Sequence, residues 1–192
     1  MLFRSGQVIA SPAVTLVDDP FHKDSPMPIH FDAEGCPTKA KNVIEAGELK
    51  TLLYNLKTAA VAGKETTGNA SKGSYSASVG VRPFTMYLAG GTFTEEELLQ
   101  KAGTGVFINS LSGLHAGADP VSGDFSLQSA GFLIENGEKT KAVKSFTVAG
   151  NFYELLKNIT AVANNSKVPA AMGITAFGAP SVLVENLSIA GK

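Results

Sequence analysis

The sequence predicts an α+β fold that is rich in strands, with mainly antiparallel sheets made of hairpins and two or three helices packed on them. Three observations indicate this class. Strand-like segments outnumber helical ones, their turns are mostly of hairpin length, and strands do not alternate with helices as they do in a parallel sheet. The chain has 192 residues, of which 44% are hydrophobic, so we expect a single domain over residues 1–192.

Two stretches predict β-hairpins. Residues 131–143 carry Asn136-Gly137 at their centre, a pair that readily adopts the positive φ angles of a type I′ turn. Residues 42–54 repeat this plan around Gly47, although the pair Ala46-Gly47 forms such turns less readily. A further strand is expected over residues 7–17, which are rich in β-branched residues, and its Pro12 places it at a sheet edge or a bulge.

Helix-capping patterns mark the helices. Thr94, followed by Glu97 three residues later, predicts a helix that ends at Gly103. Asn151 and Glu154 predict a second helix, and a short third one follows Lys57. The second helix is expected to bury an apolar stripe made of Leu155, Leu156, Ile159, Val162 and Ala163.

Composition limits the classes of partner and the compartment. Sixteen basic and seventeen acidic residues give a net charge of −1, so the chain lacks the positive field with which proteins attract nucleic acid directly. The single cysteine, Cys36, cannot form an internal disulfide, which favours the reducing cytoplasm. No window approaches the roughly 18 apolar residues of a membrane span, and the start of the chain has no signal peptide but enters strand-like sequence at once, as a fragment of a longer protein would.

One segment offers metal-ligand side chains, but without the spacing that a metal site needs. No two histidines lie four residues apart to share one helical face, so we expect a solvated loop whose aspartates cap turns. Cys36 lies at the end of this segment, directly before Pro37, and we interpret it as incidental rather than as a nucleophile. The acids and histidines in question are Asp18, Asp19, His22, Asp24, His30, Asp32 and Glu34.

The stretch "GLHAGADPVSGDF", residues 113–125, contains the residue types of a hydrolytic triad. It lacks the G-x-S-x-G pattern of a nucleophile elbow, and triad residues normally come from separate elements. We therefore expect a conformationally demanding loop, in which glycines adopt positive φ and aspartates bond to backbone amides. The residues concerned are His115, Asp119, Ser122 and Asp124, with Gly113, Gly117 and Gly123 between them.

A second loop is expected over residues 63–78, "GKETTGNASKGSYSAS", which has almost no large apolar groups. A mobile loop of this length in a compact domain is usually a binding element or disordered. Its glycines do not follow the order of a nucleotide-binding P-loop, so no nucleotide is expected. Asn69 in this loop is a candidate contact for a ligand or a partner.

Five phrases in this order resemble the C-terminal half of the TldD/PmbA family, often described as modulators of DNA gyrase. The resemblance covers nearly the entire chain. The phrases are "VDDPFHKDSPMPIHFDAEGCPT", "LLYNLKTAAVAGKETTGNASKG", "GLHAGADPVSGDFSLQSAGFLIENGE", "FTVAGNFYELLKNITAVANN" and "APSVLVENLSIAG".

The resemblance implies a β-rich domain that follows an N-terminal α/β region, in a peptidase assembled from TldD-type and PmbA-type (TldE) subunits. In that family the TldD-type subunit carries zinc on a His-Glu-x-x-x-His helix, completed by a cysteine near its C-terminal end. This sequence has no His-Glu pair, and the segment "KVPAAMGITAFGAPS", where the cysteine is expected, has none. The resemblance therefore implies the PmbA/TldE-like type, with no catalytic residue and no metal or other cofactor in this chain, and zinc only in a TldD-type partner.

We accordingly expect a non-catalytic subunit domain of a cytoplasmic TldD/TldE-type metallopeptidase complex that degrades or processes peptides. Its expected partners are a TldD-type protease subunit and unfolded peptide, with a homodimer as a further option and neither nucleic acid nor membrane. An exposed sheet edge could hold the peptide as an added strand. His115, Asp119, Ser122, Asp124 and Asn69 are the candidates for a substrate channel or a subunit interface. Two alternatives stay open: an interaction protein that modulates DNA gyrase, and a stand-alone hydrolase that uses the His115 loop.

Overall fold

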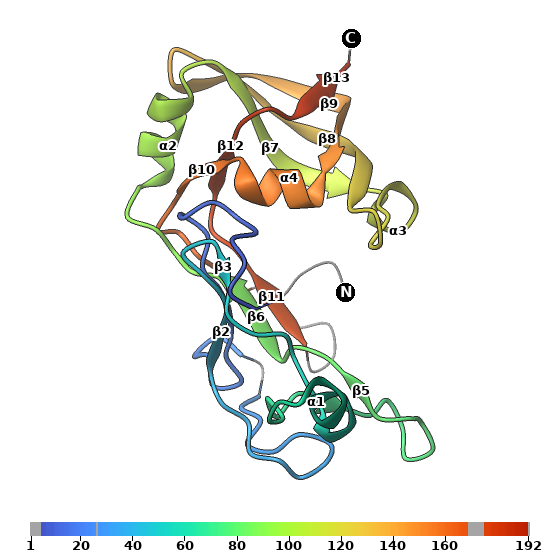
Figure 1. The fold of residues 1–192 in the computed structure, drawn as a ribbon. Helices are drawn as coiled ribbons and strands as arrows, with labels where there is room; N and C mark the ends of the chain where they lie inside the picture. Colours follow the sequence, from blue (N-terminus) through green and yellow to red (C-terminus); the bar gives the residue numbers. More distant parts are fainter. Residues whose placement is uncertain (1–4, 26, 169–174, 192) are drawn as a thin grey trace. The chain divides into compact units, whose positions relative to one another are not determined.

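A computed structural model describes residues 5–25, 27–168 and 175–191. The chain is rich in strands, its sheets are mainly antiparallel, and four helices lie in the described residues, so the predicted α+β class is confirmed (Figure 1). None of these four helices is long and apolar enough to cross a membrane.

The contacts divide the chain into two compact units, each of which is described by itself. The expectation of a single domain over residues 1–192 stays a prediction. Unit 1 comprises Met1–Val8, Val14–Ala89 and Ser166–Pro180, and unit 2 comprises Ile9–Ala13, Gly90–Asn165 and Ser181–Lys192.

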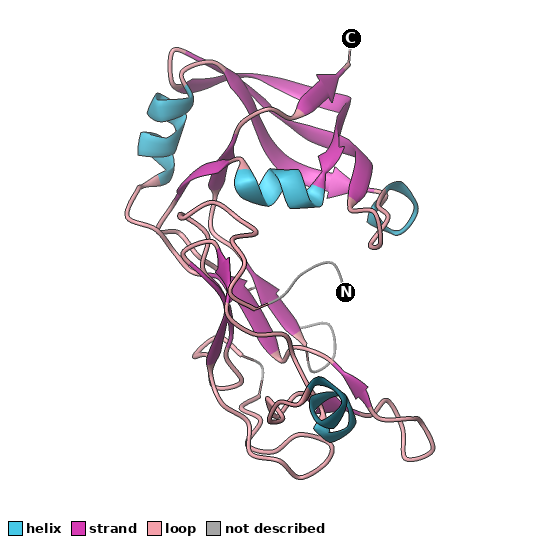
Figure 2. Cartoon of the chain, viewed as in Figure 1, coloured by secondary structure: helices cyan, strands magenta, loops and turns pink. Residues whose placement is uncertain are grey.

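Unit 1 is built on a five-stranded sheet in the order β11-β6-β1-β2-β3, in which β11 and β6 are parallel and the other pairs antiparallel. Long loops connect these short strands (Figure 2). A two-stranded pair, β4 with β5, and the helix α1 complete the unit. The bounds are β1 (Leu16–Asp18), β2 (Lys41–Glu45), β3 (Glu48–Leu49), α1 (Leu56–Ala62), β4 (Ala70–Ser71), β5 (Gly80–Val81), β6 (Thr85–Leu88) and β11 (Ala176–Gly178).

Two expectations for unit 1 are wrong in part. The strand expected over residues 7–17 covers only Leu16–Asp18, lies in the middle of the sheet rather than at its edge, and shifts its register between Leu16 and Val17 rather than at Pro12. The stretch of residues 63–78 is a loop over most of its length as expected, but residues 67–70 are buried and Ala70–Ser71 form β4. Composition misled here because buried polar groups, and not large apolar side chains, hold this segment in place.

Unit 2 contains a four-stranded antiparallel sheet in the order β13-β9-β8-β7, whose long central strands are visible in Figure 2. A two-stranded antiparallel pair, β10 with β12, and three helices accompany it. Leu98 of α2 packs with Ala161 and Ala163 in one buried cluster. The bounds are α2 (Glu95–Ala102), β7 (Gly105–Ser112), α3 (Leu114–Gly117), β8 (Asp124–Glu135), β9 (Glu138–Asn151), α4 (Phe152–Lys157), β10 (Ile159–Val162), β12 (Val182–Val184) and β13 (Ser188–Ala190).

Both predicted hairpins form, one in each unit. The turn between β8 and β9 has φ angles of 54° at Asn136 and 80° at Gly137, and the turn between β2 and β3 has 46° at Ala46 and 84° at Gly47. Two successive positive φ angles are the type I′ geometry, whose twist matches that of the paired strands. A Cβ at Gly137 would also lie 2.6 Å from the Oε1 atom at the end of the flexible Gln100 side chain, so it is the positive φ angle that favours glycine there.

The two helices with predicted caps begin where expected, but one ends early. The short helix expected after Lys57 is α1, which already begins at Leu56. Thr94 and Glu97 form the reciprocal capping box at the start of α2, and Gly103 caps its end. Asn151 caps α4, which stops at Lys157. The apolar stripe expected to continue through Ile159 and Val162 is wrong, because that segment is β10 and pairs with β12.

Candidate functional site

Three of the predicted site residues, His115, Asp119 and Ser122, lie in the segment that connects β7 to β8, and a fourth, Asp124, is the first residue of β8. Gly113 has a φ of 84° and lets the chain leave β7 and enter α3. The positive φ expected at Gly117 is wrong: this residue is needed for space, since a Cβ there would lie 2.4 Å from the carbonyl oxygen of Ser126. The chain therefore packs closely against the start of β8.

Asp119 organises the turn that follows α3. Its Oδ1 atom accepts hydrogen bonds from the backbone N–H groups of Val121 and Ser122, at 2.7 and 3.3 Å. Its own N–H donates to the carbonyl oxygen of Asp124 at 2.9 Å, and the Ser122 hydroxyl accepts from the N–H of Asp124. The expected bonding of Asp119 to backbone amides is thus confirmed, and these bonds hold the turn in this conformation.

The side chain of Asn151 holds Asp124, and the sequence did not predict this contact. Its Oδ1 atom accepts from Nδ2 of Asn151 at 2.8 Å, so the expected bonding of this carboxylate to backbone amides is wrong. The same amide donates to the carbonyl oxygen of Ser122, while its Oδ1 caps α4 by accepting from the N–H groups of Tyr153 and Glu154. Asn151 therefore links the turn to the helix, and its hydrogen bond, followed by that of Ser122, lowers the pKa of Asp124 below its ordinary value.

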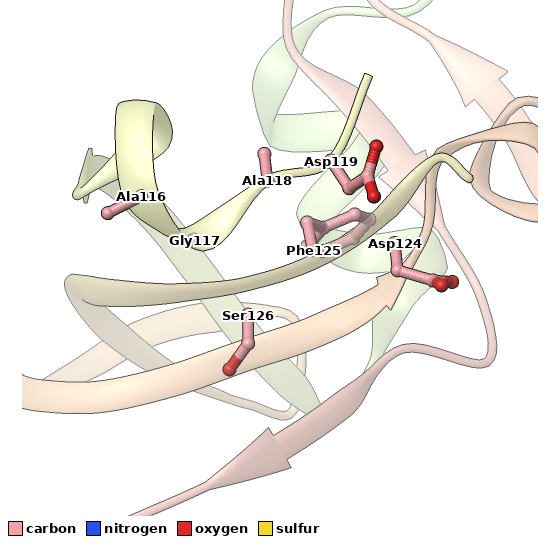
Figure 3. A pocket seen from close by; sticks show the side chains of 7 residues that line it. All are labelled: Ala116, Gly117, Ala118, Asp119, Asp124, Phe125 and Ser126. Carbon is pink, nitrogen blue, oxygen red and sulfur yellow. The ribbon is translucent and has the colours of Figure 1, made fainter. Parts of the chain in front are cut away.

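Beside this turn lies an open hollow of about 370 Å³ (Figure 3). Asp119, Asp124 and Phe125 are among the residues that line it, as labelled in Figure 3. The lining residues are Ala116, Gly117, Ala118, Asp119, Asp124, Phe125 and Ser126. His115 and Ser122 do not line it, so the structure brings two of the four candidates together at this place.

The geometry gives no triad in this segment. His115 is exposed on α3, and none of the hydrogen bonds of the described residues joins it to Ser122, Asp119 or Asp124. Ser122 uses its hydroxyl to accept from a backbone amide. A hydrolytic site would need a base within hydrogen-bond reach of the hydroxyl.

Asn69 lies in unit 1, apart in the sequence from these four residues, and it is fully buried. Its Nδ2 atom donates to Oδ2 of Asp18 at 2.7 Å and to the carbonyl oxygen of Arg82 at 3.0 Å. Asp18 is itself fully buried, forms a 3.1 Å ion pair with Lys41, and accepts from the N–H of Phe84 through its other oxygen. Asn69 is therefore part of a buried polar network.

The acids and histidines of residues 18–34 do not form a metal site. Asp32 accepts from the N–H groups of Glu34, Cys36 and Ala70. The rings of the two histidines pack on aromatic rings, His22 on Tyr87 and His30 on Phe21. In the part of the chain that the structure describes, no three His, Cys, Asp or Glu side chains gather around a point where a metal could bind, so these residues do not fit the zinc of a metallopeptidase.

Cys36 does not have the surroundings of a nucleophile. Burial foremost, and then the carboxylates of Asp32 and Glu34, raise the pKa of its thiol above the ordinary value. A catalytic thiol needs the opposite shift, because the thiolate is the reactive form.

Comparisons with known proteins show the family. The chain matches the family model of the PmbA/TldA metallopeptidase C-terminal domain over residues 1–191, and it belongs to this family. The resemblance found in the sequence is thereby confirmed.

Three similar proteins illustrate the match. A candidate modulator of a DNA gyrase from Thermotoga maritima has a crystal structure that is 43% identical, with a TM-score of 0.88 over 97% of this chain and 41% of that one. TldE from Thermococcus kodakarensis is 32% identical, with a TM-score of 0.86 over 97% of this chain and 42% of that one. A metalloprotease TldD homolog from Buchnera aphidicola is 29% identical over 97% of this chain and 40% of its own length. The chain thus spans about two fifths of these relatives.

Proposed function

We propose that this chain is the C-terminal domain of a non-catalytic, PmbA/TldE-like subunit in a cytoplasmic TldD/TldE-type metallopeptidase complex that processes peptides. A TldD-type partner supplies the zinc and the catalytic residues. The similarity to TldE from Thermococcus kodakarensis supports this assignment.

The observation that carries the proposal is the position of the single cysteine. The family resemblance places a zinc-binding cysteine near the C-terminal end of a TldD-type subunit, whereas Cys36 lies in the loop before β2 and has a raised pKa. The segment from Lys167 to Ser181 has no Cys, His, Asp or Glu. This chain therefore does not offer the late zinc ligand of a TldD-type subunit.

The free edge of β7 is the proposed docking place for an extended peptide. Among the described strands, β7 pairs only with β8, and its eight residues include no charged side chain. The outer side of β9 is unpaired over residues 138–146, since β13 covers only Thr147–Ala149, but lysines at 139, 141 and 144 occupy that stretch. Lysines on an edge discourage the addition of a strand. We therefore expect a peptide to add to the uncharged edge of β7 and not to the lysine-bearing edge of β9.

The loop of residues 113–124 adjoins the end of β7. We infer that it forms one wall of a channel in which the peptide lies along the edge of β7. Because hydrogen bonds from Asp119 and Asn151 hold its turn, we interpret this loop as an ordered wall. His115 is exposed just beyond Ser112, the last residue of β7, where it can contact a peptide that follows this strand.

The test uses the full-length protein with its TldD-type relative. We expect the two to co-elute as one complex, and a labelled unstructured peptide to bind it. Replacing both Ser110 and Ser112 by lysine weakens peptide binding, whereas Thr140→Lys on the lysine-bearing part of β9 leaves it unchanged. Separate elution of the two proteins contradicts the subunit assignment, and equal binding by all variants contradicts docking on β7.

One alternative is kept because of the Thermotoga maritima relative and its description as a candidate modulator of a DNA gyrase. In that case the chain is an interaction module for gyrase protein rather than for DNA, in line with the net charge of −1. Retention of purified gyrase subunits by the full-length protein, without any association with a TldD-type subunit, favours this function.

A further inference from the structure

Arg82 is a half-buried cation for which the described chain provides no acceptor. It follows β5, and its Nε atom is buried without a hydrogen-bond partner. No ion pair or side-chain hydrogen bond of the described residues involves its guanidinium group. Burial also lowers the pKa of Arg82 below its ordinary value, with no acidic group opposing the shift. A partly buried guanidinium without an acceptor is costly, because its donors lose water and gain nothing in exchange.

Among the residues that the structure describes, Lys41 is the other cation that is not exposed, and it is paired. Its side chain is 8% exposed and forms an ion pair with Asp18. All acidic side chains of the chain lie within the described residues, and none of them reaches Arg82. The acidic side chains of this chain therefore supply no carboxylate for Arg82.

Buried groups hold the backbone on both sides of Arg82. Its N–H donates to the carbonyl oxygen of Asn69 at 3.1 Å, and its carbonyl oxygen accepts from Nδ2 of Asn69 at 3.0 Å. Asp18 binds both Asn69 and the N–H of Phe84, two residues further along. The backbone at Arg82 is thus held in place before any ligand arrives, which lowers the entropic cost of binding.

We propose that Arg82 is a receptor for a single carboxylate supplied from outside the chain segment described here. The planar guanidinium group offers two parallel N–H donors that match the two oxygens of a carboxylate. Asn69 acts as a positioning residue for Arg82.

Two sources can supply this carboxylate. One is an acidic side chain or the C-terminus of a bound peptide, which rests on the proposed peptide-processing function. Exposed apolar side chains of the same hairpin, Tyr75, Val79 and Val81, offer such a peptide a contact surface. The other source is a fixed carboxylate elsewhere in the assembled protein, which does not depend on that function.

The first arm of the test measures peptide binding to the full-length protein in complex with its TldD-type relative. The probes are two fluorescein-labelled unstructured peptides, one with glutamates and a free C-terminus, the other with glutamines and an amidated C-terminus. We expect the acidic peptide to bind about tenfold more tightly, Arg82→Gln to abolish this preference, and Arg82→Lys to keep part of it. Lys72→Gln, which removes an exposed charge from the same hairpin, leaves the preference unchanged.

The second arm measures the melting temperature of the same assembly without peptide. Where a fixed carboxylate pairs with Arg82, Arg82→Gln lowers the melting temperature, because a buried partner is left alone. Where the partner is a peptide, the melting temperature stays the same or rises. A lowered melting temperature without any peptide binding contradicts the proposed peptide function and supports the receptor role of Arg82. The proposal is overturned if Arg82→Gln keeps the full preference for the acidic peptide. It is also overturned if the unaltered protein shows no such preference and Arg82→Gln does not lower the melting temperature.

Discussion

Replacing Asp18 by asparagine tests the buried polar network of unit 1. Asp18 is completely buried, and its Oδ2 atom accepts from both Lys41 and Asn69 while Oδ1 accepts from the N–H of Phe84. Whichever way the new amide group is turned, its N–H donors face another donor: either Lys41 and Asn69, or the N–H of Phe84. The charge of Lys41 is left buried and unpaired.

Removal of one partner from a buried ion pair costs about 3–5 kcal/mol, so we expect Asp18→Asn to lower the free energy of unfolding by this amount. Urea titration of the full-length protein, followed by circular dichroism, measures it. The double variant Asp18→Asn with Lys41→Met recovers about 1 kcal/mol or more, because no buried cation is left. As a control, Lys50→Met breaks the exposed pair with Glu48 and costs less than about 1 kcal/mol.

Two results would refute this reasoning. A loss below about 1 kcal/mol for Asp18→Asn means that water or a local rearrangement replaces the ion pair. Strict additivity of the Asp18 and Lys41 substitutions means that the two groups do not interact.

Three further predictions concern other sites. Hydrogen bonding by Lys139, with weaker help from neighbouring side chains, holds the pKa of Glu95 below its ordinary 4.5. The stabilisation by Glu95 is therefore complete above about pH 4.5 and is lost as the pH falls through the lower pKa of the folded state. Glu95→Gln makes the free energy of unfolding less dependent on pH in that acidic range, and urea titration at several pH values measures this. Gly131→Ala destabilises the protein by about 1–3 kcal/mol in the same assay, because its Cβ would lie 1.8 Å from a carbonyl oxygen of β7, whereas Gly105→Ala, with open space around it, does not. Cys36 reacts slowly with Ellman's reagent at neutral pH and faster only above its ordinary pKa of 9.0, and rapid reaction at neutral pH would contradict the raised pKa.

The sequence predicted best those features that neighbouring residues determine. The capping box of Thr94 and Glu97 and the turn at Asn136-Gly137 depend only on side chains and φ angles within a few residues. The resemblance to the family likewise rested on continuous phrases.

Features that depend on distant partners were not predictable. The stripe through Ile159 and Val162 suits a helix face and a strand equally, and pairing with β12 decides for the strand. Asn69 was singled out as a contact for a ligand or a partner, but it is fully buried, and its burial depends on Asp18, 51 residues away in the sequence. Arg82 was missed because the lack of a partner for its guanidinium can be recognised only in the structure.

The central claim is that this chain belongs to a subunit without metal whose partner performs the chemistry. Elemental analysis of the purified full-length protein, alone and after co-expression with its TldD-type relative, tests it together with a peptide-cleavage assay on both samples. We expect neither zinc nor cleavage from the protein alone, and both from the complex. Stoichiometric zinc and cleavage by the protein alone would contradict the account.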